Sequence, residues 1–334
     1  MMSRSQTATA PLVLCLAALV VVLVLVGNLP PQDVSAGPRP LGSLVLGVGI
    51  DAAYASVVAA VKKGFMQKHG IDATIRIFPS GQEALEAVLT GQSDFTGNGQ
   101  YNIPLVAARG GNIKIIAEYE RSPKQFGAIS NSGVTKPADL IGKRIATQFG
   151  TSPDYYYRLY ARHYGLDESK ITLVNLQFAQ LVPALANGDI DAFFAFEPHL
   201  TRALVGVPGS RILHRSGQDN VMLLRVYAGV SQKLYSNREL AVAFLKALVE
   251  AGDWSNAQRE ETARLISQEF RVKLSDALRF VGYFDYTVRF DKDAMAELER
   301  VTQFLLDRKL VQTRPDLSTF VTTEFMKSAD PSRI

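Results

Sequence analysis

From residue 44 onward, short apolar runs alternate with longer segments in which apolar residues recur every three or four positions. The short runs predict strands at 44–48, 74–78, 113–118 and 171–174. The longer segments predict helices at 52–69, 81–90, 151–164 and 179–187. This alternation is typical of doubly wound α/β proteins, in which helices cover both faces of a mostly parallel sheet.

One short pattern occurs twice. In 87–95 and again in 184–192, the end of a helix is followed by a glycine, two residues, an aspartate and an apolar strand. Gly91 and Gly188 fit the left-handed position just past a helix, where a side chain would be strained. Such junctions can recur by chance in any α/β protein. The matched Gly-x-x-Asp spacing, at a separation suited to one compact lobe, favours two lobes of similar build.

The length of 334 residues predicts about two domains. Apolar runs at 125–130 and 221–230 are expected to cross from one lobe to the other. The last part of the chain is mainly amphipathic helix and is expected to pack back on the first lobe. We therefore expect the first lobe to comprise 41–124 plus 229–334, and the second lobe to comprise 125–228.

Residues 1–36 are expected to lie outside this fold. An almost entirely apolar stretch at 11–26 is followed by a Pro-Pro pair, and small residues ending at Ala36 suit a signal peptidase. We interpret 1–36 as an export signal that is either cleaved or kept as a membrane anchor. The single cysteine, Cys15, lies in the apolar stretch without a small residue before it, which argues against lipid attachment. The exported part would then have no cysteine nucleophile and no thiolate metal site.

Charge and motifs argue against several classes of function. The formal net charge of +4 is small and spread out, so nucleic acid is not an expected partner. The chain has no Gly-x-Ser-x-Gly elbow, no His-Glu-x-x-His and no P-loop, and its four histidines lack metal-ligand spacing. Residues 47–52 match the dinucleotide fingerprint, but Pro79 and Ser80 stand where an acid should close the second strand. We expect no cofactor, no metal and no catalytic residue.

Polar and glycine-rich turns follow the predicted strands. In open α/β sheets, ligands bind at the edge formed by the carboxyl ends of the strands. With two lobes, the turns of both would line one cleft. Glycine allows close backbone approach, and helix N-termini present free amides that suit a carboxylate or sulfonate. The candidate ligand-binding residues are Asp51, Tyr54, Ser80, Gly81, Asn98, Gly99, Gln100, Gly150, Thr151, Ser152, Tyr155 and Glu197.

Some of these residues have a purely structural alternative. The hydroxyls of Ser80 and Thr151 fit helix N-caps as well as ligand contacts. Tyr155 begins a run of three tyrosines that must point around most of a helix, and we favour it for the cleft. Glu197 could bind an amine or could simply begin the next helix. Aromatic residues near the turns would suit a ring or alkyl portion of a ligand: Tyr54, Tyr101, Tyr155, Tyr156 and Phe178.

Taken together, several segments resemble the nitrate/sulfonate/taurine and thiamine-pyrimidine family of substrate-binding proteins of ABC importers. The segments that carry the resemblance are 63–65, 69–72, 84–94, 136–146, 150–152, 187–192 and 196–198. They are specific for the family and not for its ligand. The resemblance implies a two-lobed α/β periplasmic-binding-protein fold of type II, with two doubly wound lobes joined by two crossing strands.

The resemblance also implies a function. The protein would be a periplasmic or otherwise extracytoplasmic receptor, not an enzyme, that closes on one small solute and delivers it to an ABC permease in the inner membrane. The solute would be anionic or zwitterionic, such as a sulfonate, taurine or nitrate, and we expect a monomer. The ligand loops carried over from the family are 49–54, 80–81, 98–100, 150–152 and Glu197. The family often has Trp before the Glu-Pro pair, where this chain has Phe196.

Two alternatives stay open. An enzyme on the same fold, such as a lyase or a pyrimidine-precursor enzyme, would need a general acid or base, for which Asp51, Glu118 and Glu197 are the candidates. Yeast-type pyrimidine synthases of this fold carry a cysteine cluster that this chain lacks. A membrane-tethered ligand-sensing module would require that residues 1–36 remain attached.

Overall fold

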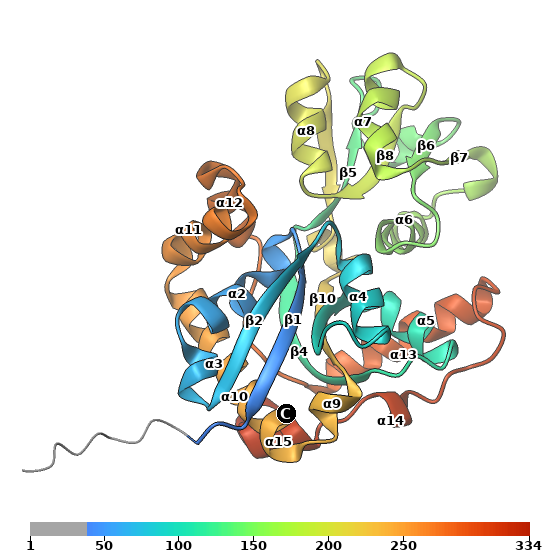
Figure 1. Cartoon of the computed structure of the whole chain (residues 1–334). Coiled ribbons are helices and arrows are strands. Elements are labelled where there is room, and N and C mark those ends of the chain that lie inside the picture. The colour runs from blue at the N-terminus through green and yellow to red at the C-terminus, as the bar shows by residue number, and fades with distance from the viewer. Residues whose placement is uncertain (1–38) are drawn as a thin grey trace, which may run out of the picture. The chain divides into compact units, whose positions relative to one another are not determined.

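The computed structural model describes residues 39–334, which contain two five-stranded sheets (Figure 1). The first sheet has the order β2-β1-β3-β10-β4, with β1 (Gly42–Gly49), β2 (Ile71–Phe78), β3 (Phe95–Gly99), β4 (Lys114–Ser122) and β10 (Leu224–Val230). The second has the order β7-β6-β8-β5-β9, with β5 (Phe126–Ser130), β6 (Arg144–Thr147), β7 (Thr172–Asn175), β8 (Ala192–Phe196) and β9 (Arg211–Arg215). The export signal or anchor expected in 1–36 lies outside the described residues.

The two sheets share one plan. β1 pairs in parallel with β2 and β3, as β6 does with β7 and β8. The fourth strand of each sheet is antiparallel to both of its neighbours. It is also the first strand entered after the chain changes sheet: β5 follows β4 across 123–125, and β10 follows β9 across 216–223. The predicted fold class, two α/β lobes joined by two crossings, is confirmed.

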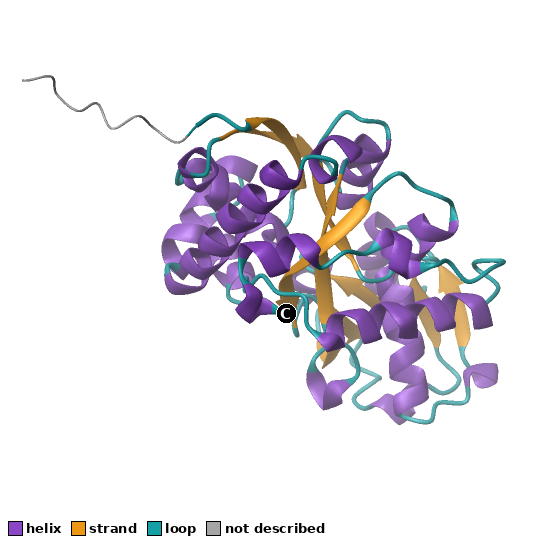
Figure 2. Ribbon diagram, turned by 90° about the horizontal axis from the view of Figure 1, so that it is seen from below, coloured by secondary structure: helices purple, strands orange, loops and turns teal. Residues whose placement is uncertain are grey.

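Helices flank the strands on both sides (Figure 2). The helices of the first lobe that share the larger core are α2 (Ala55–Lys62), α3 (Phe65–Lys68), α10 (Arg238–Ala257), α11 (Arg259–Phe270) and α12 (Leu274–Val281). Those on its other face are α4 (Gly81–Leu89), α5 (Asn102–Ala108), α13 (Lys292–Asp307) and α14 (Leu317–Phe320). The second sheet is covered by α6 (Ser152–His163) on one face and by α7 (Phe178–Asn187) and α8 (His199–Gly206) on the other. Two short helices complete the set, α9 (Gln232–Tyr235) and α15 (Glu324–Ala329). None of the helices within 39–334 is both long and apolar enough to cross a membrane.

The repeated sequence pattern performs the same task in both lobes. Its two glycines have φ of +75° and +77°, as predicted for the position after a helix. The carboxylate of Asp94 accepts a hydrogen bond from the backbone N–H of Val45 on β1 at 2.9 Å. The carboxylate of Asp191 accepts one from the N–H of Arg144 on β6, also at 2.9 Å. Each aspartate therefore ties the third strand to the first strand of its own sheet.

Two predicted boundaries are wrong. The helix expected over 52–69 begins as a 3-10 turn, η1 (Ala52–Tyr54), and is interrupted at Gly64, whose φ of +77° suits glycine and not a continuing helix. Residues 224–228, which the sequence placed in the second lobe, belong to β10 and pair with β3 and β4. The apolar run at 221–230 joins a sheet only from Leu224 on, so the return crossing precedes this strand.

Candidate functional site

Asp51 holds the turn that follows β1. Its Oδ1 accepts a hydrogen bond from the backbone N–H of Ala53 at 2.9 Å, which caps η1. Its Oδ2 accepts one from Nε2 of Gln125 at 3.1 Å, and Gln125 lies in the crossing that leads into β5. Burial raises the pKa of Asp51 to about 6. Asp51 thus links the turn after β1, where a ligand is predicted to bind, to the segment 123–125 that connects the two lobes.

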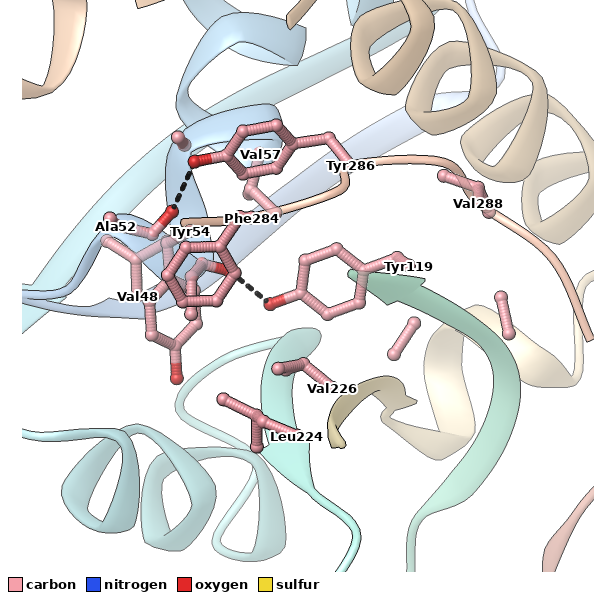
Figure 3. Packing of buried hydrophobic residues seen from close by; sticks show 14 of the residues in the cluster. Val48, Ala52, Tyr54, Val57, Tyr119, Leu224, Val226, Phe284, Tyr286 and Val288 are labelled. Atoms are coloured by element: carbon pink, nitrogen blue, oxygen red, sulfur yellow. Dashed lines mark hydrogen bonds between the residues drawn. The ribbon is translucent and has the colours of Figure 1, made fainter. Parts of the chain in front are cut away.

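Buried tyrosines fix the backbone of the same turn (Figure 3). The hydroxyl of Tyr286 donates to the carbonyl oxygen of Ala52 at 3.2 Å, and that of Tyr119 donates to the next carbonyl at 3.0 Å. Tyr54, a predicted ligand residue, is itself buried, and its hydroxyl donates to the carbonyl oxygen of Gly97 at 3.0 Å. Tyr54 therefore connects the turn after β1 to strand β3.

The turn after β2 reaches the same place. The predicted N-cap at Ser80 is present and forms a capping box at the start of α4. Oγ of Ser80 accepts from the N–H of Glu83 at 3.4 Å, and the Glu83 carboxylate accepts from the N–H of Ser80 at 2.9 Å. A Cβ on Gly49 would stand 2.8 Å from the backbone nitrogen of Gly81, so the two turns can meet only with glycine at position 49. Ser80 remains exposed beside this contact.

The end of β3 brings the lobes together at one point. A Cβ on Gly99 would stand 3.6 Å from Oγ of Ser152, the first residue of α6. Gln100 is used differently, because its side-chain amide forms hydrogen bonds of 2.8 and 2.9 Å with the backbone at the start of β10. Asn98 is buried opposite Tyr227 in the β3–β10 pairing. Of these three predicted residues, Gly99 lies at the contact between lobes, Asn98 lies within the first sheet, and Gln100 directly follows β3.

The helix α6 begins at Ser152, one residue after the predicted start, and it lacks the predicted cap. Oγ1 of Thr151 donates to the carbonyl oxygen of Gln148 at 2.6 Å and caps no helical amide. The carboxylate of Asp154 accepts from the N–H of Gly150 at 3.1 Å. Thr151 therefore closes the loop before the helix, and the first-turn amides of α6 receive no hydrogen bond from its hydroxyl.

Tyr155 packs between the lobes. Its ring centroid lies 4.8 Å from that of Phe304 on α13 and 5.9 Å from that of Tyr101. It also borders a cavity of about 580 Å³ between α6, the return crossing and α13. The structure thus places Tyr155 against a helix of the first lobe, and Tyr156 is buried inside the second.

Glu197 is buried at the end of β8. Its Oε1 lies 2.8 Å from Nη2 of Arg215, and its Oε2 accepts from the backbone N–H of Thr201 at 3.0 Å. Both contacts stay inside the second lobe. An amine-binding role for Glu197 would have to compete with this ion pair.

Three rings pack together at the edge of the second sheet where β6 and β8 end, and Phe149 lies in the loop that follows β6. We call these four residues the aromatic edge: Phe149, Phe178, Phe196 and His199. The ring centroids of Phe178 and Phe196 are 4.7 Å apart, and His199 lies 5.2 Å from Phe196 and 5.7 Å from Phe178. The loop that carries Phe149 is tied to the start of α7, because the N–H of Phe178 donates to Oε1 of Gln148 at 3.3 Å.

Only part of the aromatic edge was predicted from the sequence. Phe178 was expected in the aromatic wall and Phe196 was noted for its place before the Glu-Pro pair, whereas Phe149 and His199 were missed. The available signal was position, since Phe149 comes two residues after the end of β6 and His199 three residues after the end of β8. Burial lowers the pKa of His199, so this ring is uncharged at neutral pH.

A second histidine, His214 on β9, lies in the core of the second lobe. It is hydrogen-bonded through Nδ1 to the hydroxyl of Tyr156, and its Nε2 lies 3.8 Å from the carboxylate of Asp219. Burial lowers the pKa of His214 to about 4 despite the nearby carboxylate.

Acid is expected to destabilise the protein through His214. The unfolded chain binds a proton near pH 6.5, whereas the native state holds His214 neutral down to about pH 4. Above pH 6.5 the neutral His214 therefore has no effect on the pH dependence of the free energy of unfolding. As the pH falls from 6.5 to about 4, this free energy decreases by up to about 1.4 kcal/mol per pH unit. Asp51 titrates in the same window with the opposite sign, so the informative quantity is the difference between wild type and His214→Phe in denaturant unfolding. The exposed His163→Gln should keep the wild-type slope; a His214→Phe variant that also keeps it would contradict the prediction.

The third acid considered for catalysis, Glu118, is fully buried on β4. Its Oε2 accepts from Nη1 of Arg225 at 2.8 Å, and Arg121 also donates to its carboxylate. Among the residues that the structure describes, no group of three or more His, Cys, Asp and Glu side chains could hold a metal ion.

Comparison with known proteins decides the family. The profile of the NMT1/THI5-like family matches residues 51–262. This chain belongs to that family. The NMT1/THI5-like chain is 26% identical over 215 residues to a "Putative binding protein" of Brucella abortus (strain 2308), covering 64% of this chain and 66% of that protein, just under two thirds of its length. It is 25% identical over 295 residues to a "Putative aliphatic sulfonates-binding protein" of Bacillus subtilis (strain 168), covering 84% and 87%.

Solved structures confirm the fold of this NMT1/THI5-like chain. The periplasmic aliphatic sulphonate binding protein SsuA from Escherichia coli superimposes with a TM-score of 0.74 at 20% identity, covering 84% of this chain and 92% of SsuA. The desulfurization enzyme DSZB has the same fold, with a TM-score of 0.63 at 19% identity over 86% and 99%. The expected family resemblance and the periplasmic-binding-protein fold are confirmed. Family membership and the named relatives support a solute-binding role, while the fold itself also occurs in an enzyme.

Proposed function

We propose that this protein is an extracytoplasmic receptor that binds one small anionic or zwitterionic solute of the sulfonate class and delivers it to an ABC permease. In this proposal it is periplasmic, monomeric and not an enzyme. The observation that carries the proposal is the common plan of the lobes, which meet where Gly99 at the end of β3 faces Ser152 at the start of α6. A solute that contacts both lobes would stabilise their closed arrangement by the contacts it makes only there.

The proposed ligand site lies between the turns after β1 and β2 in the first lobe and the start of α6 in the second. Backbone N–H groups of Thr151 and Ser152 and the hydroxyls of Ser80 and Ser152 would bind the anionic group. Asp51 would shape the site by holding its turn to the crossing at Gln125. The other predicted residues would support the site from behind: Tyr54, Asn98, Gln100, Tyr155 and Glu197.

Ligand binding is expected to raise the melting temperature. A solute present at one hundred times its Kd and bound only by the folded form stabilises it by about 2.7 kcal/mol, which corresponds to roughly 5 °C for a chain of this size. The measurement is a thermal shift screen of taurine, alkanesulfonates, nitrate and formylated pyrimidines. Ser152→Ala should reduce the shift, and Ser169→Ala, an exposed serine of the same lobe, should not. A screen without any shift would refute the receptor proposal.

An enzyme is the second candidate, favoured by one observation. The raised pKa of Asp51, about 6, suits a general acid or base near neutral pH. Turnover of a sulfonate or sulfinate that disappears in Asp51→Asn, while binding persists, would establish this alternative. Binding without turnover in the wild-type protein would support the receptor.

A further inference from the structure

A cavity of about 580 Å³ lies between the lobes, apart from the proposed ligand site. It is lined by α6 of the second lobe, by α13 of the first lobe and by residues 220–223 of the return crossing. The predicted ligand residues all lie within 39–334, and Tyr155 alone among them lines this cavity. We call it the α6–α13 pocket. Its size falls within the range of about 300–1,000 Å³ that is usual for small-molecule sites.

Two walls of the pocket are helix faces. Tyr155, Leu159 and Arg162 recur at helical spacing on α6, and Arg300 and Phe304 do so on α13. The two helices touch beside the pocket, where the ring centroids of Tyr155 and Phe304 lie 4.8 Å apart. The pocket is therefore a space that both lobes enclose, and its shape depends on how the lobes are arranged.

The lining combines apolar and charged side chains. The apolar ones come from both helices and the crossing: Leu159, Val221, Met222, Leu223 and Phe304. The charged ones are three arginines and two acids: Arg162, Arg225, Arg300, Glu297 and Asp307. This excess of one positive charge, next to an apolar surface, is complementary to a ligand that carries one negative charge on an apolar body.

The three arginines differ in their capacity to bind an anion. Arg225 and Arg300 already have carboxylate partners, at 2.8 and 2.7 Å. Arg162 is exposed and has no acidic partner in the part of the chain that the structure describes, whereas Arg158, one turn earlier, has two. A guanidinium group offers five N–H donors in a planar fork that matches a carboxylate. Arg162 is thus the group of the pocket best able to accept a new anionic partner.

Arg162 and Arg300 approach one point from opposite lobes. Burial and the nearby Glu297 carboxylate raise the pKa of the Tyr155 hydroxyl, whereas the positive charges of Arg300 and Arg162 oppose this shift. Both guanidinium groups are therefore close enough to the hydroxyl to act on it electrostatically. Like charges on the two lobes repel each other, and an anion between them would be attracted by both.

We propose that the α6–α13 pocket binds a small monocarboxylate with an alkyl or aryl body, as an effector distinct from the solute of the proposed ligand site. Its carboxylate lies between Arg162 and Arg300, where it offsets their repulsion. Its apolar body lies against Leu159, Met222 and Phe304, from which it displaces water.

Binding in this pocket is coupled to the arrangement of the lobes. The effector contacts both lobes, beside an existing ion pair in which Arg308 of α13 lies 3.5 Å from Glu168 of the second lobe. It therefore stabilises the arrangement in which Gly99 faces Ser152, and it should increase the affinity of the proposed ligand site. This coupling rests on the proposed receptor function, whereas binding of the effector itself does not.

Calorimetry on the full chain with 4-phenylbutyrate as the probe tests the inference. Acetate lacks the apolar body and should bind at least tenfold more weakly. The neutral 4-phenylbutan-1-ol lacks the charge and should also bind at least tenfold more weakly. When the solute found by the thermal screen saturates the ligand site, 4-phenylbutyrate should still bind, about fivefold or more tightly.

Variants at an exposed position separate the pocket from the rest of the molecule. Arg162→Gln should weaken the binding of 4-phenylbutyrate about tenfold, and Arg162→Lys should weaken it less, because lysine keeps the charge without the fork. The matched control is Arg211→Gln, which removes an exposed arginine of the same lobe at the start of β9 and should bind the probe as wild type does.

The outcomes distinguish the pocket from the receptor proposal. Absence of 4-phenylbutyrate binding, equal binding by wild type and Arg162→Gln, or loss of binding when the solute is present would overturn the inference and leave the receptor intact. An affinity that the solute does not change would overturn the coupling. Binding that depends on Arg162, with no solute found by the thermal screen, would support the pocket and refute the receptor.

Discussion

Replacement of Glu118 by glutamine is expected to lower the free energy of unfolding by about 3–5 kcal/mol, because it leaves buried guanidinium groups without their carboxylate. Glu118 is fully buried, and its Oε2 lies 2.8 Å from Nη1 of Arg225, whose side chain is 8% exposed. Arg121 also donates to Glu118, and it retains Asp291 at 2.6 Å as a second partner. Arg225 retains Asp291 only at 3.8 Å, so it bears most of the loss.

The matched control is Glu299→Gln. Glu299 lies 2.9 Å from Arg314 in an ion pair whose two side chains are about half exposed, and its loss should change stability by less than about 0.5 kcal/mol. Urea unfolding followed by far-ultraviolet circular dichroism measures both. Equal stability of the two variants would show that the Glu118 network contributes no more than a surface pair.

Replacement of Gly252 by alanine is expected to destabilise the protein by about 3 kcal/mol. Gly252 lies within α10, and a Cβ there would stand 2.2 Å from the backbone carbonyl oxygen of Tyr286. A backbone oxygen cannot move aside as the tip of a side chain can, so α10 or the segment at 284–288 must shift. Since the hydroxyl of Tyr286 holds the turn after β1, the shift should also weaken solute binding.

A second glycine provides a control with the opposite sign. Gly206, at the end of α8, has nothing within 4 Å of a built Cβ and a φ that other residues adopt. Gly206→Ala should be neutral or stabilising by up to about 0.5 kcal/mol, because alanine has the higher helix propensity. Thermal unfolding of both variants checks the contrast, and a Gly252→Ala protein as stable as Gly206→Ala would contradict the close approach of α10.

The sequence predicted the fold well because the fold depends on local patterns. Strand and helix periodicity identified both lobes, and the Gly-x-x-Asp junctions marked equivalent places in them. The aspartates of these junctions accept hydrogen bonds from backbone N–H groups of a neighbouring strand. Because both lobes have the same strand arrangement, each lobe has one such aspartate. The boundary at 228 was wrong because an apolar run does not reveal which of its residues pair.

The candidate site was harder to predict because its side chains depend on distant partners. Gln100 is satisfied by backbone about 125 residues later, and Tyr155 packs on Phe304 of α13. Glu197 is paired with Arg215 of the next strand but one in the sheet. No local pattern shows these contacts. Residue type and turn position therefore predicted which edge of each sheet carries the candidate site, but not which side chains there are available to contact a ligand.

The positions of the fourth strands along the chain, β10 in the first sheet and β5 in the second, also determine the order in which the two sheets can be completed. All strands of the second sheet lie in one uninterrupted stretch, from Phe126 to Arg215. The first sheet has no such continuity: β4 pairs only with β10 among its strands, and β10 is synthesised about a hundred residues later. Because contacts between distant residues slow folding, we expect the first lobe to complete its fold after the second. The edges of β3 and β4 that pair with β10 remain unpaired until the chain has been synthesised to residue 230.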